Sequence, residues 1–394
     1  MRKFFLLILL AFCLLFLAGC GQRTPVRSAA PAPGSSSDSG SFANAEESVS
    51  SSEKKISSLL DSMTPEEKVG QLFFVRCPEN AAEEDVKTYH LGGYLLFGRD
   101  FMDRTANEII QTINAYQEAA KKDSGIPLLI GTDEEGGTVV RVSSNPHLCR
   151  KKFCSPQQLF AAGGIKKAVS DTHEKDVLLK ALGINVNFAP VSDVSTDPKN
   201  FIYARSFGQN AESTAAYVSA MVSQMNSDRM GSVLKHFPGY GNNVDTHTGI
   251  SMDSRPIKTF QTSDFLPFQA GIKKSDGKTA VLVSHNLVQA MDTELPASLS
   301  PAVHKILREN LNFDSVVMTD DLAMDAVKAY AQNGNAALLA LKAGNDIVLT
   351  SDYRTQIPQI LSALKKGELS EQDLNTACRR VLLWKQSLGL FSNC

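Results

Sequence analysis

Val316-Val317-Met318-Thr319-Asp320-Asp321 is a short apolar run that leads directly into two acidic residues. Such a run is typical of a buried strand, and the acids mark its carboxyl end. Strands and helical stretches alternate over about 330 residues, which predicts a parallel sheet. Eight strands favour a single-domain (β/α)8 barrel of the TIM type over an open doubly wound sheet. The predicted strands are Gln71–Cys77, Gly93–Phe97, Pro127–Thr132, Asn185–Pro190, Ser232–Phe237, Ala280–His285, Ser315–Thr319 and Asp346–Thr350.

Amphipathic stretches between these runs predict the helices. Thr64-Pro65-Glu66-Glu67 predicts a helix start, with Thr64 as the cap, Pro65 in the first turn and Glu67 completing a capping box. Gly344-Asn345 predicts the end of another helix. The other predicted helices are Thr105–Lys122, Lys166–Leu182, Ala211–Asp228, Pro301–Leu311, Asn335–Ala343 and Gln356–Lys366.

Polar side chains follow most of the predicted strands. In a barrel the carboxyl ends of the strands meet at one face, where catalytic groups gather. A single polar strand end would only mark the start of a loop, but six ends that carry carboxylates, a lysine or histidines favour a site. These ends are Asp133-Glu134-Glu135, Ser192-Asp193, Lys235-His236, Ser284-His285-Asn286, Thr319-Asp320-Asp321 and Ser351-Asp352.

The segment from residue 235 to residue 249 joins a strand end to a loop rich in glycine. Asp245 and His247 are two residues apart, so in an extended loop their side chains face the same way. A carboxylate beside a histidine fixes its tautomer and raises its basicity, as general acid–base catalysis requires. Taken alone, this pair fits an exposed loop better than a catalytic site.

Asp320 and Asp321 follow their strand directly. An aspartate at the end of a barrel strand can act as a nucleophile that forms a glycosyl ester. The alternative is that such an acid caps the helix that follows. We assign the catalytic role to Asp320 and the capping or supporting role to Asp321.

The first residues have the pattern of an export signal. Arg2 and Lys3 precede an apolar run, Phe4–Ala18, and then comes Leu17-Ala18-Gly19-Cys20, which resembles the lipobox of bacterial lipoproteins. A transmembrane helix is the weaker alternative, because the run is shorter than the roughly 20 residues that span a bilayer. We expect a signal peptide over 1–20 and lipidation at Cys20. A Ser/Pro/Ala-rich tether over 21–55 and a folded domain over 56–394 should follow, held on the extracytoplasmic face of the cell membrane.

The composition excludes several classes of partner. The formal net charge is −2, so no basic field is available for nucleic acid. No CxxC motif or Cys/His cluster predicts a metal site. Cys149 and Cys154 are close enough in sequence for a loop disulfide, and the pairing stays open among Cys77, Cys149, Cys154, Cys378 and Cys394.

Six motifs resemble glycoside hydrolase family 3, in its β-N-acetylglucosaminidase branch. The resemblance covers about residues 55–390, nearly the whole predicted domain. The motifs are Thr132-Asp133-Glu134-Glu135-Gly136-Gly137 with Arg141, Phe188–Val194, Ala204-Arg205-Ser206-Phe207-Gly208, Lys235-His236-Phe237-Pro238-Gly239, Pro296–Ser300 and Thr319–Met324.

The resemblance implies a role for each matched position. Asp320 would be the nucleophile, and His247, paired with Asp245, the general acid/base of a retaining two-step reaction. The residues that hold the terminal sugar would be Asp133, Arg141, Arg205, Lys235 and His236. The implied activity is exo-release of β-linked N-acetylglucosamine, with peptidoglycan-derived sugars as the class of substrate. We expect a monomer that uses no metal or organic cofactor.

Three positions depart from the family pattern. Tyr240 and Thr138 stand where the family often has histidine and arginine, and Thr246 stands near His247 in place of the commoner serine. Two other readings therefore remain. One is a β-glucosidase or phosphorolytic enzyme of the same family, and the other is a sugar-binding lipoprotein without catalysis.

Overall fold

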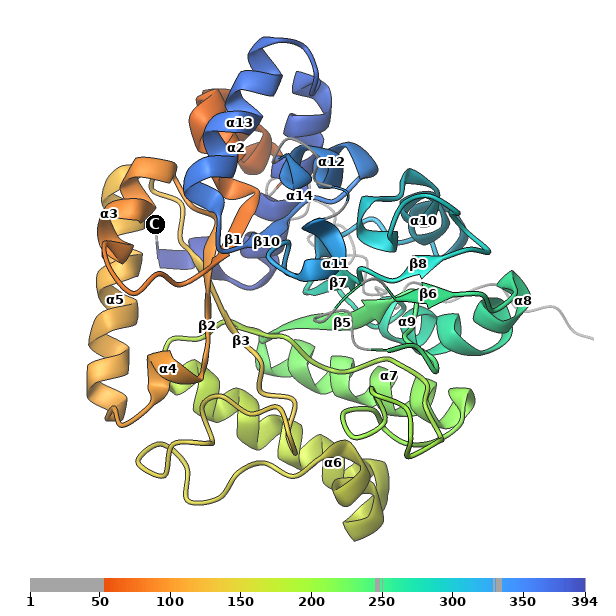
Figure 1. Ribbon diagram of the computed structural model, residues 1–394. Coiled ribbons are helices and arrows are strands. Elements are labelled where there is room, and N and C mark those ends of the chain that lie inside the picture. The colour runs from red at the N-terminus through yellow and green to blue at the C-terminus, as the bar shows by residue number, and fades with distance from the viewer. Residues whose placement is uncertain (1–52, 245–248, 250, 329, 331–334, 394) are drawn as a thin grey trace, which may run out of the picture. The chain divides into compact units, whose positions relative to one another are not determined.

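The computed structural model describes residues 53–244, 249, 251–328, 330 and 335–393 (Figure 1). The predicted signal peptide, Cys20 and most of the predicted tether lie outside the described residues, as do Asp245 and His247. Residues 53–62 are already helical, and residues 50–394 make up one compact unit.

Eight parallel strands form the centre of this unit. Their order is β10-β1-β2-β3-β4-β5-β7-β9, so each strand pairs with the next strand of this sheet along the chain, and the last strand pairs with the first. An isolated parallel bridge between Met318 and Ile347 links the two outer strands and nearly closes the sheet. The predicted barrel and its eight strands are confirmed: β1 (Phe73–Arg76), β2 (Gly93–Leu96), β3 (Leu129–Thr132), β4 (Val186–Asn187), β5 (Gly231–Phe237), β7 (Thr279–Val283), β9 (Val317–Thr319) and β10 (Val348–Thr350). A small second sheet pairs β6 (Met252–Asp253) with β8 (Leu287–Val288).

Helices surround the strands (Figure 1). The helices that contain or overlap the predicted ones are α2 (Pro65–Gln71), α5 (Ala106–Asp123), α6 (Pro156–Ala181), α7 (Ala211–Asp228), α10 (Pro301–Lys305), α12 (Ala336–Ala343) and α13 (Tyr353–Lys365). The structure adds α3 (Ala82–Tyr89), α4 (Gly98–Phe101), α8 (Ile257–Thr259), α9 (Phe265–Ile272), α11 (Asp325–Lys328) and α14 (Glu371–Ser387). None of the described helices is both long and apolar enough to cross a bilayer.

Helix ends follow the local signals. Thr64 Oγ1 accepts from the Glu67 amide at 3.2 Å, and Glu67 Oε2 accepts from the Thr64 amide at 2.7 Å, so the predicted capping box is confirmed. Gly344 ends α12 with φ of 113°. Two predictions were only partly right. α6 starts ten residues before Lys166 and is interrupted at Gly163-Gly164, and α10 continues as a π-helix, Ile306–Asn310.

Two aromatic rings fill the barrel interior. Phe74 of β1 reaches Phe188, which follows β4, with ring centroids 5.4 Å apart. Gly131 on β3 makes this possible, because a Cβ there would lie 2.7 Å from both rings. Lys235 Nζ lies 6.0 Å from the centroid of Phe188. The two buried rings therefore form an apolar layer inside the barrel, next to the polar ends of the strands.

The described cysteines are thiols. Cys77, Cys149, Cys154 and Cys378 are all free, so the loop disulfide that the sequence allowed between Cys149 and Cys154 is not formed.

A pair of acids, the buried Asp176 and the partly buried Asp228, joins α6 to α7. Asp176 is fully buried, and neither of its oxygens accepts a hydrogen bond from a described donor. Burial raises the pKa of Asp176 to about 8, and the neighbouring Asp228 adds to the effect. Asp228 in turn accepts from His173 Nδ1 at 2.9 Å and from Gln224 Nε2 at 2.8 Å. Asp176 therefore fits this site in its neutral form, which can donate to Asp228.

Asp176→Asn should make the stability of the fold less dependent on pH. The pKa of Asp176 is higher in the folded protein than in the unfolded chain, so its neutral form stabilises the fold at low pH. That stabilisation is lost as the pH rises from about 4 to about 8. The free energy of unfolding falls by up to ~1.4 kcal/mol for each pH unit in this window. Urea unfolding should show that the free energy of unfolding of the variant, relative to that of the natural protein, is higher at pH 8 than at pH 5. Exposed Asp61→Asn is the control, and an equal difference at both pH values would contradict the assignment.

Candidate active site

A buried ion cluster occupies the carboxyl ends of β3 and β5. Lys235 Nζ donates to Asp133 Oδ1 at 2.6 Å and to Glu135 Oε1 at 2.7 Å. Arg205, from the β4–α7 connection, donates to both oxygens of Glu135, through Nη2 at 2.7 Å and Nε at 3.0 Å. The side chains of Lys235 and Glu135 are only 3% and 1% exposed. Two cations thus share one buried carboxylate, and a second carboxylate, Asp133, lies beside them.

The charges of this cluster stabilise one another. Burial alone would raise the pKa of Glu135, but Arg205 and Lys235 outweigh burial and hold that pKa well below its usual range. Burial would likewise lower the pKa of Arg205, but Glu135 beside it keeps the pKa above its ordinary value. Both groups therefore stay ionised over the working pH range of proteins. The cluster presents fixed charges rather than a group that titrates.

His236 is held on both sides. Arg205 Nη2 lies 3.1 Å from His236 Nε2, and arginine can only donate, so Nε2 is the acceptor. The Nδ1 proton of His236 then points to Asp193 Oδ2, 2.8 Å away. Asp193 also accepts from the backbone amide of Tyr240 at 2.8 Å. Asp193 therefore fixes the tautomer of His236 and the position of the next turn.

The remaining acid of the β3 run has a different task. Glu134 turns away from the cluster and accepts from the backbone amides of Arg141 at 2.8 Å and Val142 at 2.7 Å. It thereby folds the loop that carries Arg141 back over the barrel. The guanidinium carbon of Arg141 lies 5.7 Å from the Phe97 ring centroid, and its buried Nε has no acceptor among the described residues. Arg141 therefore keeps a donor that no described group uses.

Asp320 lies at the end of β9, on the same face. Its amide donates to Val283 O at 3.0 Å, and its Oδ1 accepts from the Asp321 amide at 2.9 Å. Asp321 Oδ1 accepts from the Ala323 amide at 2.9 Å, which closes a turn before α11 begins at Asp325, so Asp321 does not cap that helix. The Asp321 carbonyl lies 3.0 Å from Nε2 of the fully buried His285. The backbone bond to β7 and the contact with the Asp321 amide therefore hold Asp320 in position.

The residues on either side of the segment 245–248 are tied together. Arg255 donates to Asp253 Oδ2 and Asp264 Oδ1 at 2.7 and 2.9 Å, and to the Gly239 carbonyl at 3.0 Å. Gly241 leaves room for this arginine, since a Cβ there would lie 2.3 Å from the guanidinium carbon. Burial raises the pKa of Asp264 to about 6, although Arg255 opposes the shift. One partly buried arginine thus joins residues before and after this segment.

The structure brings together most of the predicted site residues. Asp133, Arg205, Lys235 and His236 form one hydrogen-bonded group, while Arg141 and Asp320 lie on the same face of the barrel. The roles of Asp245 and His247 stay predictions, since both lie outside the described residues. Three residues of the polar strand ends had been given no individual role in the site, namely Glu135, Asp193 and His285.

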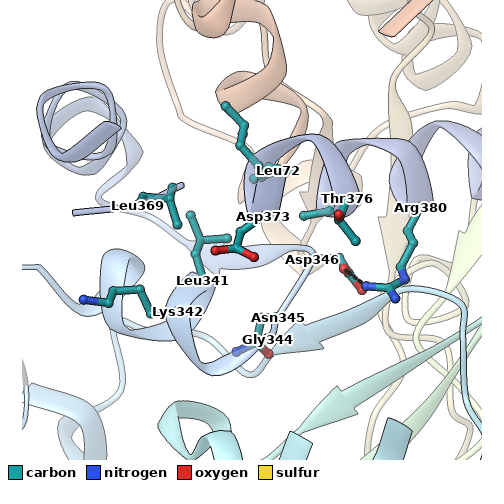
Figure 2. A pocket seen from close by; sticks show the side chains of 12 residues that line it. Leu72, Leu341, Lys342, Gly344, Asn345, Asp346, Leu369, Asp373, Thr376 and Arg380 are labelled. Carbon is teal, nitrogen blue, oxygen red and sulfur yellow. Dashed lines mark hydrogen bonds and ion pairs between the residues drawn. The ribbon is translucent and has the colours of Figure 1, made fainter. Parts of the chain in front are cut away.

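The opposite end of the barrel, where the strands begin, carries a pocket of about 150 Å³ (Figure 2). Its central charge is Asp346, which pairs with Arg380 at 3.2 Å and with Arg308 at 2.6 Å. Figure 2 shows the Asp346–Arg380 pair at the start of β10. These charges hold α14 and the π-helix Ile306–Asn310 to the barrel, so we assign this pocket a structural role. Among the described residues, no group of three His, Cys, Asp or Glu side chains is arranged as a metal site.

The comparisons with known proteins agree on one family. The model of the glycosyl hydrolase family 3 N-terminal domain matches residues 64–383. Beta-hexosaminidase LpqI of Mycobacterium tuberculosis is 30% identical over 335 residues, which cover 82% of this chain and 83% of that protein. Beta-hexosaminidase A of Pseudoalteromonas piscicida is 30% identical over 77% of this chain but only 55% of its own length. A secreted glycosyl hydrolase of Arthroderma benhamiae, which is uncharacterized, is 30% identical over 74% of this chain and 83% of that protein.

Solved structures show the same similarity. A glycoside hydrolase family 3 β-N-acetylglucosaminidase from Paenibacillus sp. str. FPU-7 superposes with a TM-score of 0.77 and 30% identity. That match covers 84% of this chain and 63% of the Paenibacillus chain. The M. tuberculosis LpqI structure gives a TM-score of 0.72 at 29% identity and covers 81% of this chain and 93% of that one.

Glu135→Gln should damage both the fold and the site. The change leaves Arg205 and Lys235 without their shared carboxylate, and breaking a buried ion pair costs about 3–5 kcal/mol. We expect a lower unfolding free energy and a large loss of sugar binding, measured by urea unfolding and by calorimetry with N-acetylglucosamine. Exposed Glu212→Gln is the control. Unchanged stability and affinity in Glu135→Gln would show that Glu135 does not organise the cluster.

Proposed function

The chain belongs to glycosyl hydrolase family 3, and on that premise we propose that it is a retaining exo-β-N-acetylglucosaminidase. The observation that carries the proposal is the buried cluster of Asp133, Glu135, Arg205 and Lys235 at the barrel end that also carries Asp320. Carboxylates beside arginine and lysine hold neighbouring sugar hydroxyl groups well. The relatives named beta-hexosaminidase support the choice of an N-acetylated sugar.

The terminal sugar would bind to the hydrogen-bond donors and acceptors that the residues of the cluster do not use on one another. Lys235 uses two of its three protons on Asp133 and Glu135, and Arg205 uses Nε and Nη2, which leaves Nη1. Asp133 binds Lys235 through Oδ1 and has Oδ2 available to accept from a hydroxyl. In this proposal Arg141 adds its unused donor, and His236 acts by holding Arg205 in place.

The chemistry would proceed in two steps. Asp320 attacks the anomeric carbon and forms a glycosyl ester, while His247 gives a proton to the leaving oxygen as the glycosidic bond breaks. His247 then takes a proton from water, which attacks the same carbon and releases the sugar from Asp320. Asp245 would orient His247 and stabilise its charged form.

The location and the class of substrate extend the proposal. Leu17-Ala18-Gly19-Cys20 supports export and lipidation at Cys20, and one relative is named as a secreted glycosyl hydrolase. We infer a signal peptide over 1–20 and a tether that begins at residue 21 and ends before the helix that starts at residue 53, rather than at residue 55 as the sequence predicts. One catalytic domain would follow, held on the extracytoplasmic face of the membrane. Peptidoglycan-derived sugars are the substrates that such a location would offer. The domain would act as a monomer.

Asp320→Asn should abolish turnover of an aryl β-N-acetylglucosaminide. The amide is a poor nucleophile, so we expect kcat to fall by about 10³-fold or more. The assay is release of the chromophore, with and without phosphate, and phosphate should have no effect on the natural protein if the reaction is hydrolysis. Exposed Asp314→Asn is the control. Near-normal turnover by a folded Asp320→Asn protein would end the assignment.

His247→Gly tests the proposed proton donor. Leaving groups that need protonation should suffer most, so the loss in kcat/KM, which reports the first step, should be large for an alkyl glycoside and small for a dinitrophenyl glycoside. The measurement is kcat/KM across a series of aryl glycosides of graded leaving-group pKa. A loss of the same size along the whole series would argue against the acid role.

A further inference from the structure

The motif Pro296–Ser300 has no role in the proposed reaction, although it lies close to the residues that lead to Asp320. Its centre is a short 3-10 helix, Ala297–Leu299. Ser298 in this helix is fully buried, and its amide donates to the carbonyl of Ser284 at 3.0 Å. Ser284 is the first residue after β7, the strand that pairs with β9. The motif is therefore attached to the carboxyl end of β7.

His285 lies between this motif and the residue that follows Asp320. Its Nδ1 is 2.7 Å from Ser298 Oγ, and its Nε2 is 3.0 Å from the carbonyl oxygen of Asp321. The side chain of His285 is fully buried, so bulk water does not compete for either contact. The imidazole ring thus joins Ser298 on one side to the backbone of Asp321 on the other.

The two contacts fix the tautomer of His285. A carbonyl oxygen can only accept, so Nε2 carries the proton that points to Asp321. In the neutral ring Nδ1 is then an acceptor, and the hydroxyl of Ser298 donates to it. Ser298 is itself held in place, because Asn345 Nδ2 donates to its carbonyl at 2.8 Å. Ser298 therefore directs the donor of His285 toward Asp321.

The peptide group between residues 321 and 322 is held at both of its polar atoms. His285 binds its carbonyl oxygen, and its amide, that of Leu322, donates to the carbonyl of Leu349 on β10 at 2.9 Å. The orientation of the Asp321 backbone also sets the direction of the Asp321 amide, which donates to Asp320 Oδ1 at 2.9 Å. His285 therefore acts on the carboxylate of Asp320 through one residue.

The alignment of this carboxylate matters for the proposed reaction. A nucleophile must approach the anomeric carbon along a defined line, and a misplacement of about 1 Å can lower the rate about 100-fold. A hydrogen bond to Oδ1 restricts rotation of the Asp320 carboxylate, provided that the donor itself cannot move. The bonds that His285 makes to Ser298 and Asp321 supply that restraint.

We propose that His285, oriented by Ser298, is a positioning residue that holds Asp320 in line for its attack on the anomeric carbon. The inference rests on the proposed function, since it takes Asp320 as the nucleophile. It also gives the motif Pro296–Ser300 a task, which is to support His285 rather than to bind sugar. His285 would affect the rate of the first step and leave the binding of the terminal sugar unchanged.

Two replacements of His285 separate its two contacts. In His285→Asn the amide can take the place of Nδ1 beside Ser298, but it is too short to reach the Asp321 carbonyl. The longer side chain in His285→Gln can bring an N–H donor to the place of Nε2. The substrate is a dinitrophenyl β-N-acetylglucosaminide, whose leaving group needs little protonation. We expect kcat/KM to fall by about 10- to 100-fold in His285→Asn and by less than about 3-fold in His285→Gln.

Sugar binding and stability distinguish positioning from a structural role. Calorimetry with N-acetylglucosamine should give an affinity within about 2-fold of the natural protein for both variants, because the ion cluster is untouched. Equal losses of kcat/KM in the two variants, in proportion to their free energies of unfolding in urea, would overturn the proposal. The control is His90→Asn, the same exchange at the opposite end of the barrel, where φ of 51° suits asparagine. Its kcat/KM should not change.

Ser298→Ala tests whether Ser298 acts through His285. Without the hydroxyl the ring is no longer held in one tautomer, so we expect a loss in kcat/KM of about 3-fold or more. The same change made in the His285→Asn protein should cost nothing further, because the bond to Asp321 is already lost. Fully additive losses would show that Ser298 has a separate task, against the proposal.

Turnover by the natural protein separates this inference from the proposed function. If the natural protein cleaves the N-acetylglucosaminide and His285→Asn does so almost as well, the positioning role is overturned and the proposed function stands. If it cleaves only dinitrophenyl β-glucoside, the proposed function fails. The same pair of variants on that substrate then decides the role of His285, because Asp320 would still be the nucleophile. If it cleaves neither substrate, both proposals fail.

Discussion

The position of the site depends on one buried carboxylate. Glu135 holds Arg205 from the β4–α7 connection and Lys235 from β5, so three segments distant in sequence are fixed to one point. A charge buried over the Phe188 ring is stable only while its partners stay in place, because an unpaired charge there would have no water to solvate it. The same requirement fixes His236, which accepts from Arg205 and donates to Asp193. The cluster therefore arranges the groups that would meet a sugar before any sugar arrives.

Strand positions were predictable because each strand is short, apolar and followed by polar residues, and both signals are local. The roles of the three acids after β3 were harder to predict. Asp133 and Glu135 are two apart in an extended segment, so they face Lys235 together while Glu134 faces the other way. That alternation could have identified Glu135. The contact between Arg205 and His236 could not be foreseen, since it depends on how far a loop 31 residues away reaches over the barrel.

The proposed nucleophile and proton donor are supported in different ways. Asp320 is held by backbone bonds between β7 and β9, which the barrel itself makes rigid. The segment proposed to carry Asp245 and His247 is instead anchored at its ends, where Arg255 joins Asp253, Asp264 and the Gly239 carbonyl. Gly241 is required there because any side chain would occupy the space of Arg255. Gly239 and Gly241 thus leave the space that Arg255 and Asp264 occupy, whereas the side chains next to these glycines are less constrained.

Tyr240 illustrates that freedom. Its backbone amide, not its side chain, binds Asp193, so a different residue can stand here without altering the Asp193–His236 pair. The Tyr240 ring packs edge-on against His236 at 5.2 Å and lies 5.7 Å from Phe201, which is 37% exposed. Tyr240 is itself only 1% exposed, so its ring packs against His236 rather than offering a face to a sugar. A change of side chain at this position would therefore act on the site through His236, which contacts Arg205.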